Sequence, residues 1–599
     1  SVGLSADSQR SLVLDLQDPE VAPVGWASHS RPAAPASSVD MAIYELHVRD
    51  FSVADASVPL AHRGKYLAFT HEQSAGMRHL RDLARAGLTD IHLLPIFDWA
   101  TAPEEGCANL DWTRLRAMPP DGMDQQAMVR ATASQDCYNW GYDPWHFNVP
   151  EGSYATQARD GRVRIRELRS MVMALHRLGL RVGMDMVFNH TSASGQHPQS
   201  VLDRIVPGYY QRLNARGEVE RSTCCDNTAT EHRMMRKLMI DSTVLWAQHY
   251  GIDSFRFDLM GHQPREAMQA LQQAVDAATG RFIPLIGEGW NFGEVANGAR
   301  FVQASQLSLN GSGIATFSDR MRDAARGGGH GDDAKALVAR QGWLNGLMLA
   351  PNESSPPTSS ADLMRHADLL RVGLAGSLRK FRMLDHQGQL RTLEQIDYAG
   401  QPAGYVSQPN EVVNYVENHD NPTLFDIHVF KLPLTATAED RARAQLLGGA
   451  LVAFSQGVMY WHAGQDILRS KSLDLNSFDS GDWFNRIDWT LQDNGFGSGV
   501  PPEPNESFWA PMRQRLARSS IKPAPSWIVW SKAAHLDLLR IRASTRLFRL
   551  RSAQEVMQRL SFPNTGPTQN PAVLVGHLNG RGLPGAQYEA LMYLSLIHI

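Results

Sequence analysis

The sequence predicts an α/β protein whose main domain is a (β/α)8 TIM barrel with elaborated βα loops. A helical pattern that stops at glycine and leads into a short apolar strand occurs three times, at Gly87, Gly179 and Gly251. Strands that alternate with helices favour parallel pairing through right-handed crossovers. Further apolar segments bring the predicted strands to eight, which suits a closed barrel better than an open sheet. These strands are residues 42–48, 91–95, 181–188, 252–259, 282–287, 314–317, 412–416 and 458–460.

The helices of the repeat are recognised by the spacing of their apolar residues. Before Gly87, Met77, Leu80 and Leu83 fall on one face of a helix. Residues 168–178 and 235–245 show the same spacing before the other two glycines. Each glycine marks a helix end, because glycine tolerates the left-handed backbone that often follows the last helical residue.

The loops between the predicted strands are uneven in length, and several are long. Residues 101–135, 327–333, 351–360 and 494–505 are rich in Gly, Pro, Ser and Asn and are predicted to be loops. In a barrel, elaborated βα loops lie at the carboxyl ends of the strands, where active sites are built.

Length and composition limit the class of protein. The 599 residues correspond to about four average domains, although one elaborated barrel can absorb most of them. With 43% hydrophobic and 20% charged residues and a net charge of −4, the chain is not of the disordered class. The charge gives no reason to expect nucleic acid as a partner, and no apolar run of about 18 residues predicts a membrane span.

The final part of the chain has a different pattern. Short segments at 536–541 and 545–550 are followed by a cluster of Pro, Gly and Asn at 562–571. We therefore expect a catalytic barrel over residues 41–525 and a partial, truncated all-β domain, part of a β-sandwich, over residues 526–599.

Four cysteines in a chain of this length do not make a disulfide scaffold. Two alternatives stay open: four free thiols, or one disulfide between Cys107 and Cys137. The adjacent Cys224 and Cys225 have no assigned state. The C-x-x-C spacing of zinc sites is missing, so zinc is not expected.

Acidic, basic and histidine side chains gather at the ends of four predicted strands. These ends read MDMVFNH from residue 184, FRFDL from 255, IGEGW from 286 and VENHDN from 416. A barrel brings such strand ends into one pocket. Each cluster alone has a structural explanation, such as a helix cap or an ion pair. Four together are costly, because carboxylates repel one another, and this indicates a functional site.

Retaining glycoside hydrolysis is the chemistry that this set of side chains fits best. It needs one carboxylate as nucleophile and a second, kept protonated, as general acid, about 5–5.5 Å apart. A nearby arginine keeps the nucleophile ionised. Aromatic side chains in the same loops suit stacking on sugar rings; they are Trp140, Tyr142, Trp145, Trp290, Phe292 and Trp461.

A metal hydrolase is the competing interpretation of the same residues. Carboxylates and imidazoles at the four strand ends also form a set of oxygen and nitrogen ligands for a divalent metal. The residues concerned are Asp185, His190, Asp258, Glu288, His419 and Asp420.

In order, the four clusters resemble the four conserved regions of the α-amylase superfamily, glycoside hydrolase family 13. The segment YNWGYDP at 138–144 resembles the signature of type I pullulanases and limit dextrinases. YELHVRDFS from residue 44, VPEGSYAT from 149, CCDNTATEH from 224 and RSKSLDLNSFDSGDWFN from 469 are also similar to this branch. The resemblance covers residues 3–579 and implies a hydrolase of α-1,6-glucosidic branch linkages in pullulan, limit dextrins, amylopectin or glycogen.

The resemblance also implies roles for individual residues. Asp258 corresponds to the nucleophile, Glu288 to the general acid/base and Asp420 to the transition-state stabiliser. Residues expected to support the transition state or bind the sugar are Arg256, His190, His419, Tyr142, Asp143, Asp185, Trp290, His262 and Asn421.

Further expectations follow from the family. Residues 1–40 look like the lead-in from a missing N-terminal β domain of the carbohydrate-binding kind. No cofactor is expected for the chemistry, and structural calcium is common in the superfamily. We expect an α-glucan substrate, a monomer, and a secreted, periplasmic or cell-surface location in a bacterium.

Two alternatives within the family stay open. One is an enzyme that acts on α-1,4 bonds or transfers glucans, although YNWGYDP argues against it. The other is an inactive glucan-binding protein, against which the intact Asp258, Glu288 and Asp420 speak.

Overall fold

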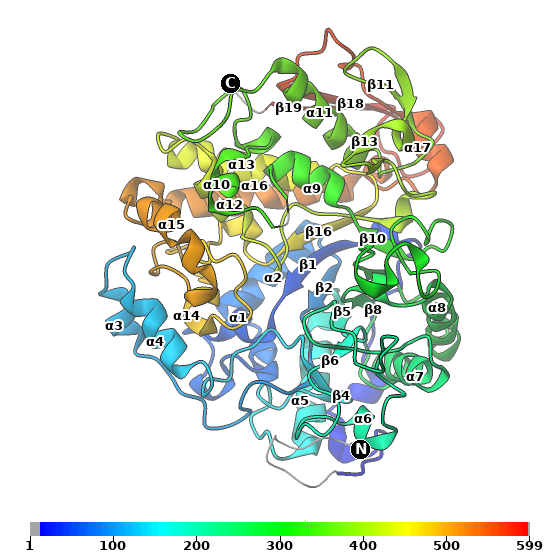
Figure 1. The fold of residues 1–599 in the computed structure, drawn as a ribbon, viewed down its shortest axis with the longest axis vertical. Coiled ribbons are helices and arrows are strands. Elements are labelled where there is room, and N and C mark those ends of the chain that lie inside the picture. Colours follow the sequence, from blue (N-terminus) through cyan, green and yellow to red (C-terminus); the bar gives the residue numbers. More distant parts are fainter. Residues whose placement is uncertain (1–11, 330, 597–599) are drawn as a thin grey trace.

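The computed structural model describes residues 12–329 and 331–596, and a closed barrel of parallel strands lies at its centre (Figure 1). Around the barrel the strands follow the order β1-β16-β15-β10-β9-β8-β5-β2. Their bounds are β1 Ala42–Leu46, β2 Asp90–Leu93, β5 Arg181–Met186, β8 Ser254–Phe257, β9 Leu285–Gly287, β10 Ala315–Phe317, β15 Val412–Asn414 and β16 Val458–His462. All eight predicted strands, and the TIM-barrel fold class, are confirmed.

Helices surround the barrel as an outer layer. The long ones are α2 Ala75–Ala86, α5 Gly161–Arg177, α7 Arg233–His249, α8 Arg265–Thr279, α11 Ser360–Leu374, α13 Ala438–Ala453 and α16 Pro525–Ser544. The shorter ones are α1 Val48–Ser52, α3 Trp112–Arg116, α4 Asp124–Thr132, α6 Leu202–Ile205, α9 Asp319–Arg326, α10 Ala334–Ala339, α12 Leu424–Lys431, α14 Gly481–Asn485, α15 Trp509–Leu516 and α17 Ala553–Arg559. The three helices predicted before glycines correspond to α2, α5 and α7.

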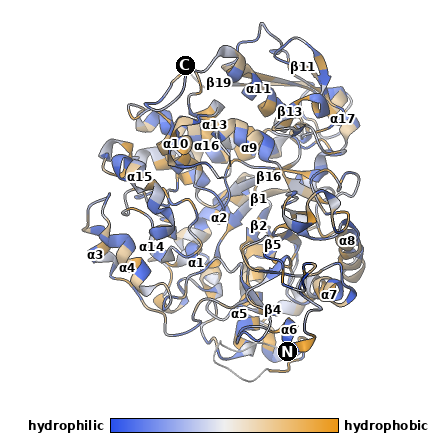
Figure 2. Ribbon diagram, in the orientation of Figure 1, coloured by the Kyte–Doolittle hydropathy of each residue, from blue (hydrophilic) through white to orange (hydrophobic). Residues whose placement is uncertain are grey.

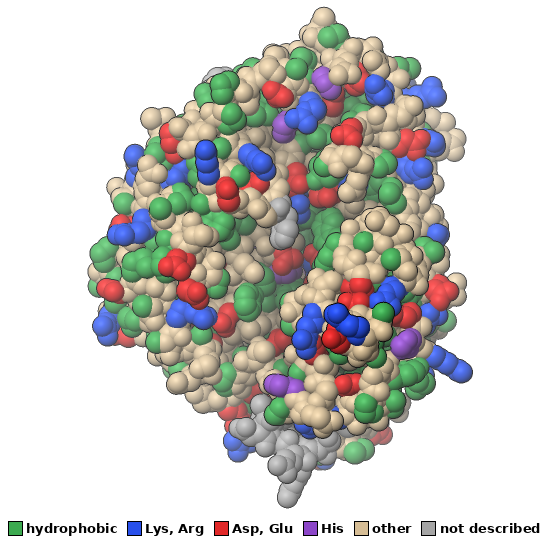
Figure 3. All heavy atoms as spheres, viewed as in Figure 1, with side chains coloured by type: hydrophobic (Ala, Val, Ile, Leu, Met, Phe, Trp, Pro, Cys, Tyr) green, Lys and Arg blue, Asp and Glu red, His purple; other side chains and the backbone are tan. Residues whose placement is uncertain are grey.

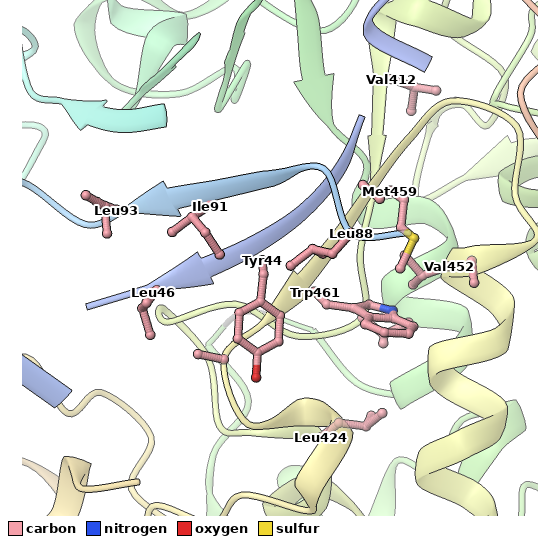
Figure 4. Packing of buried hydrophobic residues seen from close by; sticks show 14 of the residues in the cluster. Tyr44, Leu46, Leu88, Ile91, Leu93, Val412, Leu424, Val452, Met459 and Trp461 are labelled. Atoms are coloured by element: carbon pink, nitrogen blue, oxygen red, sulfur yellow. The ribbon is translucent and has the colours of Figure 1, made fainter. Parts of the chain in front are cut away.

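Side chains alternate between the two faces of the barrel wall, as a period of two requires. Ile43 of β1 points into the barrel and packs with Phe317 and Tyr460. Tyr44 of β1 and Trp461 of β16 belong to the larger core between strands and helices, where Figure 4 shows them on the side of Leu424 and Val452. Trp461 was predicted to lie among sugar-stacking aromatics, and this was wrong. It is 0% exposed and packs against helices.

The connection from β2 to β5 is one of the long excursions beside the barrel. It contains the hairpin of β3 Phe97–Trp99 and β4 Pro144–Pro150. The prediction that residues 101–135 form a loop was wrong in part, because helices α3 and α4 lie within them. A disulfide joins Cys107 to Cys137 across this excursion, which settles one alternative left open above. Cys224 and Cys225 form a second disulfide.

The predicted all-β domain over residues 526–599 begins too early. Residues 525–544 form α16, a 20-residue helix that contacts α13 and α2 of the barrel. Arg542, near its end, donates to the backbone oxygens of Val39 and Gly457 at the amino end of the barrel. Helix α16 therefore completes the outer layer of the barrel.

Within the predicted all-β region, strands occur only from residue 560 onward in the part that the structure describes. Strands β17 Leu560–Ser561, β18 Val573–Asn579 and β19 Ala590–Leu596 form a three-stranded antiparallel sheet. A second sheet, as in a complete sandwich, is not seen within residues 560–596.

Residues 12–40 pack against the barrel. The Arg31 guanidinium lies 2.9 Å from the Asp253 carboxylate, just before β8. The ring of Trp26 lies 5.0 Å from the guanidinium carbon of Arg169 in α5. The segment expected as a lead-in thus covers the amino ends of the barrel strands. The preceding domain stays a prediction.

Hydrophilic and hydrophobic residues are mixed along the outer helices, as α7 and α8 show (Figure 2). Among the described residues, no helix combines the length and the apolar character that crossing a membrane requires.

Candidate active site

The predicted site residues meet at the carboxyl ends of the barrel strands. Asp185 of β5 and Arg256 of β8 are partners in the strand register. Asp258 and Glu288 directly follow β8 and β9, and Asp420 lies in the loop after β15. The space-filling view shows one face of the molecule hollowed near its middle, where charged side chains gather (Figure 3).

Arg256 lies at the centre of four carboxylates. Its nitrogens are 2.8 Å from Asp185, 3.2 Å from Asp258, 2.9 Å from Glu288 and 3.9 Å from Asp420. The Arg256 side chain is only 2% exposed, so these charges interact through a medium poor in water. One buried cation therefore offsets the repulsion within the carboxylate cluster.

Asp258 and Glu288 form a coupled pair around this cation. Burial raises the pKa of Asp258, nearby Glu288 raises it further, and Arg256 opposes both. Burial also raises the pKa of Glu288, again against Arg256. The pair therefore retains a proton at a pH where two isolated carboxyl groups are ionised. One acid and one carboxylate is the charge state that acid–nucleophile catalysis needs.

Neighbouring groups fix both carboxylates in place. Leu259 has a φ of 40°, in the left-handed region that is strained for leucine. This conformation lets the Leu259 N–H donate to Glu288 Oε2 at 3.0 Å. Asn189 Nδ2 donates to Asp258 Oδ2 at 3.1 Å. The backbone strain is thus located where it orients a reactive group.

Glu45 of β1 holds His419, a contact that the sequence analysis missed. Its carboxylate accepts hydrogen bonds from His419 Nδ1 at 2.7 Å, from the His419 backbone N–H at 2.8 Å and from the Tyr460 hydroxyl at 2.8 Å. Burial alone would lower the pKa of His419, but Asp420 and Glu45 outweigh it and raise this pKa to about 9. His419 is therefore a cation at neutral pH, with Nε2 3.5 Å from Asp420.

Tyr142 contacts both Asp185 and His419. Its ring stacks on His419, with centroids 5.0 Å apart and planes 14° apart. Its hydroxyl donates to Asp185 Oδ2 at 2.6 Å. Burial raises the pKa of Asp185 to about 7, against the nearby Arg256. The position fits a flat aromatic wall beside the carboxylates.

His190 contacts the backbone of Tyr142. Its Nε2 donates to the Tyr142 backbone oxygen at 2.6 Å, while Nδ1 accepts from Asn189 at 2.8 Å. Burial lowers the pKa of His190 to about 4, so the ring is neutral at neutral pH. Asn421, which was also predicted to bind the sugar, donates a hydrogen bond from Nδ2 to Asn418 Oδ1 at 2.9 Å.

Three other predicted residues lie away from Arg256. The Asp143 backbone oxygen accepts from the Ala100 N–H at 3.1 Å, in the β2–β5 excursion. Trp290 follows Glu288 and packs, partly buried, on the apolar interior of the barrel. His262 Nε2 forms a hydrogen bond with Ser222 Oγ at 3.0 Å. None of these contacts ties them to the carboxylates, so their part in substrate binding stays a prediction.

The residues do not fit the metal-hydrolase alternative. The position that a divalent ion would take among Asp185, Asp258, Glu288 and Asp420 is filled by the Arg256 guanidinium. A protein cation and a metal ion at one place would repel each other.

A second acidic group also fits a metal ion poorly. Asp98, Glu104 and Glu151 offer oxygens within 4.8 Å of one another. Arg164 lies among them, 3.1 Å from Asp98 and 2.7 Å from Glu104, and supplies the countercharge. This acidic group is therefore a poor candidate for the structural calcium that the family suggests.

Little in the sequence could have identified Glu45 or Asn189. Glu45 lies in the quoted segment YELHVRDFS, but as the one acid of an apolar strand it was given no role. Asn189 lies within the quoted MDMVFNH segment, next to His190, so its place at the site was implicit. Only the closed barrel shows that both face the cluster.

Comparison with known proteins shows the family. Residues 491–594 match the family model of the C-terminal region of alpha-1,6-glucosidases of the pullulanase type. The chain is 42% identical to "Pullulanase 1, chloroplastic" of Arabidopsis thaliana, over 100% of this chain and 63% of that protein. It is 40% identical to a pullulanase of Klebsiella aerogenes, over 96% of this chain and 55% of that protein.

A solved structure gives the same result. The maltotriose complex of the PulA-G680L mutant from Klebsiella pneumoniae superposes with a TM-score of 0.94 at 38% identity, over 99% of this chain and 69% of that one. This chain spans about 55–63% of the length of the two curated relatives. From fold, site and likeness together, the chain belongs to the pullulanases of the α-amylase superfamily.

Proposed function

We propose that this chain is a retaining debranching hydrolase that cleaves α-1,6-glucosidic bonds in pullulan and branched dextrins. The observation that carries the proposal is the contact of Asp258 and Glu288 with the two terminal nitrogens of one guanidinium, at 3.2 and 2.9 Å. Two carboxyls that contact one guanidinium fit the close pair of a retaining enzyme, about 5–5.5 Å apart, whereas the carboxyls of inverting enzymes lie about 6.5–9.5 Å apart to leave room for a water.

The first step forms a covalent intermediate. An oxygen of Asp258 attacks the anomeric carbon while Glu288 gives its proton to the glycosidic oxygen, and the leaving chain departs as an alcohol. The hydrogen bonds from Arg256 and Asn189 fix the orientation of the Asp258 carboxylate and favour its ionised form.

The second step releases the sugar. Glu288, now ionised, takes a proton from water, the water oxygen attacks the anomeric carbon, and Asp258 leaves as a carboxylate. No cofactor takes part in either step.

Asp420 and His419 support the charged transition state. The Asp420 side chain is 43% exposed, unlike the other carboxylates, so it remains accessible to substrate hydroxyls. Cationic His419 is fixed at Nδ1 by Glu45 and presents Nε2 toward Asp420 and the sugar. Charge-assisted hydrogen bonds of this kind are stronger than neutral ones.

The substrate assignment rests on the relatives. Curated proteins at 40–42% identity are named pullulanases, and a matching structure is a complex with maltotriose. A neutral glucan also suits a chain with a net charge of −4.

A digest of pullulan tests the proposal. Debranching cleavage releases maltotriose, while linear amylose, which has only α-1,4 bonds, stays intact. Release of maltose or glucose from amylose would instead favour the α-1,4-acting alternative. No cleavage and no transfer by the folded chain, with retained binding of maltotriose, would favour the inactive glucan-binding protein.

Location and assembly remain proposals of the same kind. The Cys107–Cys137 disulfide supports an oxidising compartment, such as the periplasm or the cell exterior. A monomer is proposed from the family resemblance. Sedimentation of the purified chain tests it.

A further inference from the structure

The Cys224–Cys225 disulfide lies against a histidine of the candidate active site. Cys224 Sγ is 3.3 Å from His190 Nε2. The ligand atoms of Cys224, Cys225 and His190 all lie within 4.8 Å of one another. Spacing rules for zinc sites would not find this group, because two ligands are adjacent and the third lies 34 residues before Cys224.

We propose that reduction of the Cys224–Cys225 disulfide opens a binding site for a thiophilic divalent cation, such as Zn²⁺ or Cd²⁺, with both thiolates and His190 as ligands. Two thiolates and one imidazole are a known protein ligand set that leaves a fourth position for water. Soft thiolate ligands favour such metals over calcium and magnesium.

The reaction balances in two steps. A phosphine reductant and one water reduce the disulfide to two thiols, and the phosphine becomes its oxide. The metal ion then displaces one proton from each thiol, so two protons leave as two metal–sulfur bonds form.

The local fold holds the three residues together without the disulfide. Strands β6 His190–Thr191 and β7 Asp226–Asn227 pair antiparallel, with His190 opposite Asn227. The cysteines directly precede β7, so this pairing keeps them beside His190. Reduction thus requires only a local adjustment of the sulfur atoms.

Access also fits the proposal. Cys224 is exposed, Cys225 is half-buried and His190 is buried. A reductant and a metal ion reach the sulfur atoms from solvent, while His190 provides the inner ligand. A thiophilic ion placed there is partly shielded from water.

His190 Nε2, which lies beside Cys224 Sγ, is the ligand atom. Its Nε2 now donates to the Tyr142 oxygen, so metal binding requires the proton to move to Nδ1. Asn189 is bonded to Nδ1 through its nitrogen, and its Oδ1 is buried without a partner among the described residues. Rotation of this amide places Oδ1 against Nδ1–H, the second contact that metal-binding histidines use.

Metal binding would stop catalysis, a consequence that rests on the proposed function. The Asn189 rotation removes the hydrogen bond to Asp258, and the metal takes His190 Nε2 from the Tyr142 backbone oxygen. The activity is therefore expected to be insensitive to the metal in the oxidised chain and sensitive to it after reduction.

Cadmium titration tests the site without any activity measurement. The purified chain is reduced with a phosphine, freed of reductant under argon and titrated with Cd²⁺, while ultraviolet thiolate-to-cadmium absorbance is recorded. In C107S/C137S, where reduction frees only Cys224 and Cys225, we expect one Cd²⁺ per reduced chain and no such absorbance from the oxidised chain. Equal signals from both forms would overturn the proposal.

Matched variants locate the signal. Added to C107S/C137S, C224S/C225S should abolish the signal, which C107S/C137S alone keeps because Cys107 and Cys137 lie elsewhere in the fold. His190→Ala should weaken cadmium affinity by at least about tenfold, since even loss of an outer contact costs that much. A signal that persists in C224S/C225S would contradict the site. Alkylation of the reduced wild type repeats this test without a substitution.

Pullulan hydrolysis then tests the consequence. Cd²⁺ should inhibit the reduced chain and C107S/C137S, and a chelator should restore activity. Binding without inhibition would contradict the link to catalysis. If the metal-free chain does not cleave pullulan at all, the proposed function fails, while the absorbance result still decides on the metal site.

Discussion

Two buried clusters of carboxylates in this molecule are each built around one arginine, and only one of them is open. Arg256 pairs with Asp185, Asp258 and Glu288 at the carboxyl end of the barrel, and Arg164 pairs with Asp98 and Glu104 beside Glu151. We call them the Arg256 cluster and the Arg164 cluster. In both, burial raises carboxyl pKa values, to about 8 for Glu151.

Access distinguishes the two clusters. The Arg256 cluster continues to Asp420, whose side chain is 43% exposed. In the Arg164 cluster, the Arg164, Asp98 and Glu104 side chains are 0%, 1% and 4% exposed. A Cβ added at Gly152 would meet Glu104 at 2.3 Å, so no space is left there. Perturbed pKa values mark both clusters, and only an open path to solvent marks the functional one.

Asp258→Asn should have the largest effect on turnover. An amide cannot form the ester with the sugar, so we expect kcat on pullulan to fall by at least about 10³-fold, several kcal/mol of barrier. Steady-state kinetics with reducing-sugar detection measures it. The matched change Asp98→Asn in the Arg164 cluster should leave kcat of the folded protein nearly unchanged. Activity of Asp258→Asn within about tenfold of wild type would refute the nucleophile assignment.

Arg256→Lys should come next. Lysine keeps the charge but cannot present separate nitrogens to Asp258, Glu288 and Asp185. We expect kcat to fall by about 10²–10³-fold with a folded protein, because an electrostatic contact is lost. Circular dichroism checks the fold beside the kinetics. An unchanged kcat would show that Arg256 only supports structure.

Glu45→Gln should shift the pH profile. The pKa of His419 is raised to about 9, so its cation is present at neutral pH and lost as the pH rises through that value. Without the Glu45 charge, this pKa falls, and the alkaline limb of kcat/KM should move down by about one unit or more, at 1.36 kcal/mol per unit.

Tyr460→Phe is the control for this change. It removes one hydrogen bond to Glu45 but keeps the carboxylate beside His419. Its alkaline limb should therefore not move to lower pH. An alkaline limb that is the same in Glu45→Gln and wild type would contradict the role of Glu45.

Arg164→Met should have the smallest effect on kcat and a large one on stability. Removing the arginine leaves Asp98, Glu104 and Glu151 buried together, at a cost of about 3–5 kcal/mol. Urea unfolding should show a lower midpoint, while kcat of the folded fraction stays within about twofold. A strong loss of kcat with unchanged stability would reverse the comparison of the two clusters.

The barrel and its main charged groups were predictable from local patterns. Helix–glycine–strand units indicate the strands, and Asp258, Glu288 and Asp420 follow strands in recognisable segments. The resemblance of these segments to the α-amylase superfamily gave the three carboxylates their expected roles. These features depend on residues close in sequence.

Features that depend on distant packing were not predictable. Near its start, helix α16 contains Trp527, Ile528 and Val529, which favour strands, yet contacts with α13 and α2 stabilise it as a helix. Pro525 in its first turn was a helix-start signal that the sequence analysis did not use. The role of Glu45 depends on its contact with His419, which is 374 residues away in the sequence and lies beside β1 only in the closed barrel.

Trapping the glycosyl–enzyme tests the central claim most directly. Glu288→Gln, which cannot take a proton from water and so slows release of the sugar, is incubated with an α-maltotriosyl fluoride, whose fluoride leaves without a proton from Glu288, and is digested for mass spectrometry. The account predicts a sugar ester on the peptide that contains Asp258, and on Asp258 itself after fragmentation. A label on another residue, or hydrolysis with inversion at the anomeric carbon and no label, would contradict it.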